Sequence, residues 1–184
     1  MPDLSEDVLA PDVVVRRAPT TEAPARPGAD GGPPLVGAGD GALWARAEVG
    51  SAGVDLGHGS VNAVVREGTV LFDAQGGAGL VIVLRGEVDI SVHGELARTA
   101  RAGEAVSFDA TGRVSDPDPV DAAELARDPF ISLNLVLDAL AGVPLRLPEV
   151  PPTPVSTGTG APPPAGDDGP RRSRSIFGGS RSRS

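Results

Sequence analysis

The residues that could carry out catalysis or hold a metal ion are few and far apart. Cysteine and tyrosine are absent, and the two histidines, His58 and His93, are 35 positions apart. The segment DLGH at 55–58 could offer a carboxylate and an imidazole to one ion. A protein metal site needs three or four converging ligands, however, and no second histidine motif accompanies this one. We therefore expect neither a metal site nor a cofactor.

Three other patterns with catalytic associations also lack the context that they require. Ser60 follows His58 by two positions, without the strand–turn–helix setting of a nucleophile elbow. The acidic run at 116–121 lacks the glycine and the distal glutamate of a calcium loop. The glycine-rich GAGDGA at 37–42 follows a proline-rich stretch and precedes an expected strand. The sequence thus predicts no catalytic residues, and we expect a protein that is not an enzyme.

Charge is distributed unevenly along the chain. The formal net charge is −9, yet five of the 16 arginines lie in the last 14 residues, so residues 1–170 hold 11 arginines against 25 acidic residues. An acidic body disfavours binding to nucleic acid, because that binding depends on displacing counterions with basic side chains. Contact with nucleic acid or another anionic surface is therefore expected only through the tail, and a solubilising tail attracted to the acidic body is an equal alternative. The candidate partner-binding residues of this tail are Arg171, Arg172, Arg174, Ile176 and Phe177.

Nothing in the sequence predicts export or a membrane anchor. The N-terminus, MPDLSEDVLAPD, is acidic where a secretory signal is basic, and no apolar run with a cleavage site follows it. The longest apolar stretch, 79–84, is far shorter than the ~20 residues that a bilayer-spanning helix needs. We expect a cytoplasmic protein without a transmembrane segment.

Composition divides the chain into three parts. Residues 1–42 contain seven prolines and only short apolar clusters, and residues 149–184 are a proline-rich linker followed by the Arg/Ser tail. Both segments are predicted to be disordered arms, because they cannot bury enough apolar surface to offset the entropy of ordering the chain. Residues 43–148 form the predicted folded domain, in which short apolar runs alternate with glycine and aspartate.

Short strands dominate the predicted domain. Two glycine-containing tripeptides, 66–68 and 85–87, are predicted to be hairpin turns. The run 80–84 is apolar at every position, which suits a central strand covered on both faces, and the later helix is a candidate cover. The expected strands are 43–49, 53–56, 60–66, 69–73, 80–85, 88–93, 96–100 and 105–109. The predicted fold class is mainly β, a small antiparallel roll, sandwich or barrel of about eight short strands followed by one or two packed helices.

The last part of the domain has helical spacing. Asp121 is placed to cap a first helix, with Glu124 three residues later, and Pro129 is placed to begin a second helix that ends at Gly142. The second helix carries one apolar stripe at three- and four-residue spacing. The members of this stripe are Phe130, Leu133, Val136, Leu137 and Leu140. We expect the stripe to pack on the sheet, although a helix that binds a partner protein would show the same pattern.

The central segment of the chain, from Val61 to Val114, reads VNAVVREGTVLFDAQGGAGLVIVLRGEVDISVHGELARTARAGEAVSFDATGRV. This segment resembles a FecR-like domain. Three parts of the family pattern have counterparts here: a valine-flanked G-T before an aromatic, a V-x-V-L-x-G-x-V-x-V segment, and an A-G-E before another strand. They lie at Val65–Phe72, Val81–Val92 and Ala102–Glu104. The later ELARDPFISLNLVLD is similar to the helical segment that follows such domains in some actinobacterial proteins.

This resemblance implies a non-catalytic β domain in signalling, linked to the control of an extracytoplasmic-function sigma factor across a membrane. The chain departs from that architecture, because its sequence shows no transmembrane helix, no anti-sigma helical domain and no zinc-binding Cys/His cluster. We therefore expect a soluble regulatory or protein-interaction module that binds a protein partner of unknown identity.

Two further interpretations stay open at this point. GEVDISV followed by RAGEAVSF also resembles the strands of cupin barrels, which would make the domain a small-molecule-binding barrel without a metal. A strand that is apolar on both faces, next to glycine-rich neighbours, would also suit a scaffold protein that self-associates through its sheet edges.

Overall fold

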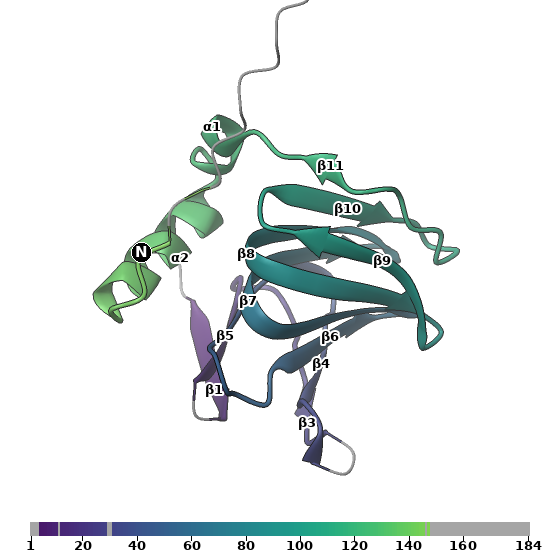
Figure 1. Ribbon diagram of the computed structural model, residues 1–184, viewed down its shortest axis with the longest axis horizontal. Coiled ribbons are helices and arrows are strands. Elements are labelled where there is room, and N and C mark those ends of the chain that lie inside the picture. The colour runs from purple at the N-terminus through teal and green to yellow at the C-terminus, as the bar shows by residue number, and fades with distance from the viewer. Residues whose placement is uncertain (1–3, 11, 29–30, 146, 148–184) are drawn as a thin grey trace, which may run out of the picture. The chain divides into compact units, whose positions relative to one another are not determined.

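The computed structural model describes residues 4–10, 12–28, 31–145 and 147, and these residues form a mainly β unit (Figure 1). Eleven strands within these ranges join in one hydrogen-bonded, nearly closed, barrel-like sheet, and two helices follow them. No helix in the described ranges is long and apolar enough to cross a membrane. The strands are β1 (Ser5–Ala10), β2 (Val13–Arg17), β3 (Ala25–Arg26), β4 (Leu35–Gly37), β5 (Gly41–Ala47), β6 (Val54–His58), β7 (Val61–Gln75), β8 (Ala78–Val92), β9 (Glu95–Arg101), β10 (Glu104–Phe108) and β11 (Asp118–Pro119), and the helices are α1 (Ala122–Leu125) and α2 (Pro129–Leu140).

The long β7–β8 hairpin organises the sheet. Each of its strands has 15 residues, and their pairing runs from Val61 opposite Val92 to Gln75 opposite Ala78. The hairpin bends where Gly68 lies opposite Gly86, and the pairing register shifts on both sides of Gly68. The predicted turns at 66–68 and 85–87 are therefore wrong. Glycine bends the paired strands there without ending them.

The bend divides the sheet into two layers. The first half of β7 pairs with β6, and the second half of β8 pairs with β9. Beyond the bend, the second half of β7 pairs with β5, and the first half of β8 pairs with β10. Alternate side chains from both layers meet in one apolar core between them. The predicted mainly β class with two following helices is confirmed.

The N-terminal segment corrects the expectation of a disordered arm over 1–42. Strands β1 and β2 form an antiparallel hairpin, and β2 then pairs with β5 along its whole length. Val13 and Val15 are fully buried in the core between the layers. Three consecutive valines give this strand two side chains on its core face, although the average composition of the segment is that of a loop. The predicted arm over 149–184 lies outside the described residues.

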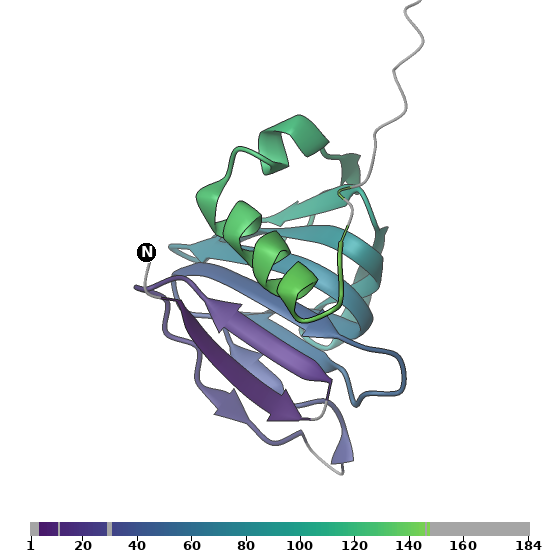
Figure 2. The ribbon, with the colours of Figure 1, turned by 90° about the vertical axis from the view of Figure 1, so that its left-hand side faces the viewer.

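A second apolar cluster lies on the outer face of the layer that contains β5 and β8. Along β8, Val81 and Val83 point into the core between the layers, whereas Ile82 and Leu84 pack outward. Helix α2 crosses this outer face (Figure 2) and adds Ile131 to the cluster. The prediction that 80–84 forms a central strand covered on both faces is confirmed.

Both helices begin at the predicted positions. The Asp121 side chain accepts a hydrogen bond from the backbone N–H of Ala123 at 2.8 Å at the start of α1. Helix α2 begins with Pro129, and the carboxylate of Asp128 caps its first turn. These caps fix where α2 starts and therefore which of its side chains face the sheet.

Candidate functional site

Helix α2 is the candidate site, and its polar and apolar faces are the reverse of the usual arrangement. The side chains turned to the sheet are those of Ile131, Asn134 and Asp138, and the last two are 0% exposed. Val136 and Leu140 point away from the sheet, with 56% and 80% exposure. The predicted packing of the whole apolar stripe on the sheet is therefore wrong. Its other members, Phe130, Leu133 and Leu137, are half-buried.

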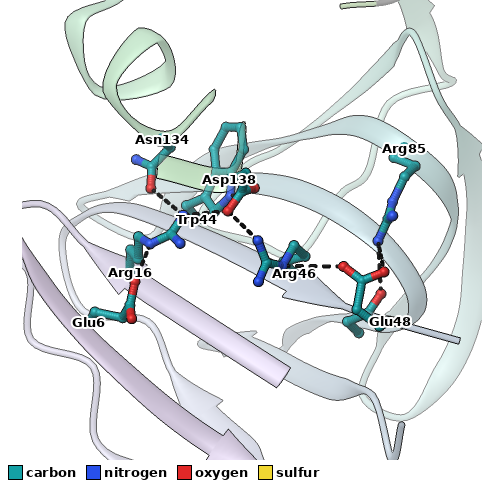
Figure 3. Close-up of polar contacts among 9 residues, drawn as sticks. Glu6, Arg16, Trp44, Arg46, Glu48, Arg85, Asn134 and Asp138 are labelled. Atoms are coloured by element: carbon teal, nitrogen blue, oxygen red, sulfur yellow. Dashed lines mark hydrogen bonds and ion pairs between the residues drawn. The ribbon is translucent and has the colours of Figure 1, made fainter. Parts of the chain in front are cut away.

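The buried polar face of α2 ends in a clamp around the carboxylate of Asp138 (Figure 3). Oδ1 accepts hydrogen bonds from Nη1 of Arg16 and Nη1 of Arg46, each at 2.6 Å. Oδ2 accepts a third hydrogen bond from the indole Nε1 of Trp44 at 3.0 Å. We call Arg16, Trp44, Arg46 and Asp138 the Asp138 clamp. It joins α2 to β2 and β5.

The two arginines of the clamp are also held from the side of the sheet. Arg16 Nε donates to a carboxylate oxygen of Glu6 on β1 at 2.5 Å. Arg46 Nε lies 3.3 Å from Glu48, which in turn accepts a hydrogen bond from Arg85 at 3.0 Å. The guanidinium groups therefore keep acidic neighbours that do not belong to α2.

These contacts balance the positive charges of the two buried arginines in the clamp. Arg16 is only 3% exposed and Arg46 only 7% exposed, so their charges need partners inside the protein. Burial alone would lower the pKa of Arg16, but its hydrogen bonds to Glu6 and Asp138 outweigh burial and raise that pKa above its ordinary value. Arg16 therefore enters the clamp as a positively charged guanidinium group.

Asn134 completes the polar face one helical turn before Asp138. Its Nδ2 donates to the backbone carbonyl of Phe130 at 2.8 Å, and its Oδ1 lies 3.4 Å from Nη1 of Arg16. An asparagine and an aspartate four residues apart, on a helix whose only other polar residue is Ser132, are the sequence signal for this buried face. Sequence reasoning missed it, along with Arg16, Trp44 and Arg46, because it followed only the apolar spacing.

The histidines that the sequence offers as metal ligands or catalytic groups lie in ordinary backbone surroundings. Nδ1 of His58 donates to the backbone carbonyl of Ala38 at 2.7 Å, and His93 lies in the turn between β8 and β9 with a φ of 52°. Within the described ranges, no three His, Asp or Glu side chains lie close enough together to hold a metal ion. Residues Arg171, Arg172, Arg174, Ile176 and Phe177 lie outside the described part of the chain.

A cleft of about 410 Å³ opens over the bend of the β7–β8 hairpin, and its lining is mostly charged. Its side chains include Arg66 and Asp89, which form an ion pair of 2.5 Å, and the adjacent Glu67 and Glu87. The space between the two layers is filled by side chains, among them the fully buried Phe72. Phe72 packs there against Phe108, with their ring centroids 5.6 Å apart.

Comparison with known proteins finds solved structures that have a similar fold. No family model matches the chain, and no curated protein matches its sequence. Two crystal structures from Parabacteroides distasonis ATCC 8503, each described as that of a candidate anti-sigma factor, are similar to it. One has a TM-score of 0.55 and 15% identity and covers 76% of this chain and 71% of its own. The other has a TM-score of 0.54 and 16% identity and covers 74% and 69%. At this level of identity the likeness concerns the fold.

Proposed function

We propose that this chain is a non-catalytic regulatory protein that acts by binding another protein, as FecR-like regulators of extracytoplasmic-function sigma factors do. Two independent likenesses support the proposal. The text from Val61 to Val114 resembles a FecR-like domain, and the fold is similar to that of two proteins described as candidate anti-sigma factors. A sigma factor is accordingly the partner that we propose.

The outward face of α2 is the observation that carries this proposal. The helix has a single charged residue, Asp138, and that residue is fully buried. Leu133, Val136 and Leu140 share the opposite face, and we call these three residues the outer stripe. A surface helix ordinarily turns charged side chains to water, whereas an apolar face that stays exposed marks a binding surface.

The Asp138 clamp gives the outer stripe a fixed orientation. A helix held at a buried carboxylate cannot roll to bury its leucines, because rolling would strip Arg16 and Arg46 of their counter-charge. A rigid helix that presents i, i+3 and i+7 side chains is a recurrent way of recognising a partner protein. Filled packing between the layers favours this surface over the cupin-like alternative of an internal ligand pocket.

The test replaces one residue of the outer stripe with a charge. Leu140→Asp changes a side chain that is 80% exposed, and Leu96→Asp on β9 is the matched control at 65% exposure. Each purified full-length variant is titrated against every extracytoplasmic-function sigma factor of the source organism by biolayer interferometry. We expect one sigma factor to bind the wild type and the Leu96→Asp variant and to lose at least tenfold in affinity for Leu140→Asp.

Two outcomes would contradict the proposal. If no sigma factor binds the wild-type chain, the proposed partner class is wrong. If Leu140→Asp and Leu96→Asp bind equally well while both melt like the wild type, the outer stripe is not the binding surface. Self-association of the wild type in size-exclusion chromatography, abolished by Leu140→Asp, would favour the scaffold alternative.

A further inference from the structure

No strand covers the outer edge of β1 within the described part of the chain. β1 ends the order of strands in the layer that α2 crosses, and it pairs only with β2 (Figure 2). We propose that this edge is a second recognition surface, to which a short extended segment of another protein adds as one more strand. The segment runs antiparallel to β1 and carries apolar residues followed by two basic residues. The inference goes beyond the proposed function, because it depends neither on the outer stripe nor on a sigma factor.

The other three ends of the two layers are closed to an added strand. Prolines flank β3 on both sides, one proline precedes β11 and another ends it, and proline has no N–H to donate to a neighbouring strand. At β9, the side chain of Arg98 donates to the carbonyl of Ala97 at 2.7 Å and so occupies a backbone acceptor of that strand. β1 contains no proline, and the side-chain hydrogen bonds of its described residues join side chains only. Its backbone edge is therefore open.

The first four residues of β1 are a regular template for pairing. Ser5 to Val8 pair without a break with Arg17 to Val14 of β2, and the register shifts only beyond Val8. The N–H and C=O groups of a strand point alternately to its two sides, so β2 uses one half of them and the other half faces outward. Such a row of unpaired backbone groups is what an added strand binds.

The side chains along β1 determine what the added strand must carry. Glu6 and Asp7 are paired with arginines of β2, yet their side chains remain 48% and 42% exposed. Val8, which follows them, is 67% exposed. In an antiparallel neighbour, the residue opposite Val8 comes before the residues opposite Asp7 and Glu6. The complementary segment is therefore apolar first and basic afterwards.

Strand β2 shows that a segment of this kind pairs with β1. Its sequence is VVVRR, and its antiparallel pairing sets Val14 opposite Val8 and Arg16 opposite Glu6. A segment with the same pattern would meet the same side chains of β1 from the opposite side. The excess of acidic residues in the body of the chain also attracts a basic segment.

A second copy of β1 fits this edge poorly. Antiparallel pairing of two copies over all six residues would set Glu6 opposite Leu9 of the second copy and Asp7 opposite Val8. Each carboxylate would then lie beside an apolar side chain and lose water without gaining a counter-charge. The pattern therefore favours a segment of another protein.

The test uses the ¹⁵N-labelled full-length chain and two synthetic peptides with blocked ends. The probe has the sequence of residues 12–18, DVVVRRA, and its matched control carries Arg16→Glu and Arg17→Glu. Each peptide is titrated into the chain and followed by ¹H–¹⁵N NMR spectra. We expect the probe to shift the amide resonances of β1 and to slow hydrogen exchange at its outward amides at least about tenfold. The control peptide should bind at least about tenfold more weakly, because two attractive contacts become repulsive.

Variants of the chain locate the binding surface. Val8→Lys places a positive charge at the edge, and Val49→Lys, in the turn after β5, is the matched control at 73% exposure. We expect Val8→Lys to weaken binding of the probe at least about fivefold and Val49→Lys to leave it unchanged. If Val8→Lys lowers the melting temperature, Asp7→Lys takes its place. Leu140→Asp should not affect the probe, which separates this surface from the outer stripe.

Several outcomes would overturn the proposal. Equal binding of the two peptides, or binding of neither, shows that the edge does not select a basic strand. Shifts confined to other strands, or equal binding by the Val8→Lys and Val49→Lys chains, place the probe elsewhere. A wild-type dimer that Val8→Lys dissociates shows that a second copy occupies the edge.

Discussion

Replacing Asp138 with alanine is the most direct test of how α2 is held. The substitution removes a carboxylate that accepts three hydrogen bonds, two of them from guanidinium groups. Arg16 and Arg46 are then left almost completely buried and lose their shared counter-charge, although Glu6 and Glu48 remain beside them. Removing one partner of a buried ion pair costs about 3–5 kcal/mol.

Detachment of α2 limits this loss. Once the helix leaves, both guanidinium groups regain water. The remaining cost is the lost burial of Ile131, about 1.5–3 kcal/mol for such a side chain, together with the lost contacts of the partly buried Phe130 and Leu135. We therefore expect the free energy of unfolding to fall by about 3 kcal/mol, the lower end of the range for a buried pair. A loss of this size is a large fraction of the stability of an ordinary domain.

Urea denaturation followed by tryptophan fluorescence measures this loss, because the protein has a single tryptophan and its indole donates to Asp138. The matched control is Asp7→Ala, which breaks the partly exposed 3.4 Å pair between Asp7 and Arg17. That change should cost less than about 1 kcal/mol. Equal losses for the two variants would refute the reasoning, since α2 would then not depend on its buried carboxylate.

Two further predictions concern the bend of the hairpin and its surface. Gly86→Ala should destabilise the protein by roughly 2 kcal/mol more than Gly94→Ala does. Both glycines have a positive φ, but a Cβ at Gly86 would collide with a backbone carbonyl, whereas a Cβ at Gly94 would meet open space. Equal losses of unfolding free energy in urea would contradict this prediction. The hydrogen bond from Arg66 holds the pKa of Asp89 below its usual value, so this stabilisation is present above about pH 4 and is lost as the pH falls through the lowered pKa. Arg66→Ala should therefore cost less than about 1 kcal/mol at neutral pH, and a cost that grows on acidification would show the assigned cause to be wrong.

The features that the sequence predicted well are those encoded by neighbouring residues. Asp121 caps α1 and Pro129 begins α2 because both signals act within one helical turn. The run 80–84 is apolar at every position, which only a strand covered on both faces can accommodate here. Local patterns of this kind need no knowledge of distant strands.

The features that the sequence did not predict depend on distant partners. Glycine suits both a turn and a bend, and only the opposite strand decides that Gly68 and Gly86 continue a hairpin. Arg16 lies 122 positions before Asp138, so no local pattern joins them. The apolar spacing predicts that the outer stripe packs on the sheet, because spacing alone does not tell which face of a helix meets a buried carboxylate.

The length of the β7–β8 hairpin also sets an order of assembly. Its turn, with positive φ at Gly76 and Gly77, closes a pairing between neighbouring residues, and such hairpins form in about 1–10 μs. Because both layers share this hairpin, the other strands can add to an edge that already exists. During synthesis, however, β1 and β2 leave the ribosome long before β7. We therefore expect Val13 and Val15 to wait without their core partners, which exposes the N-terminal hairpin of the nascent chain to misassembly.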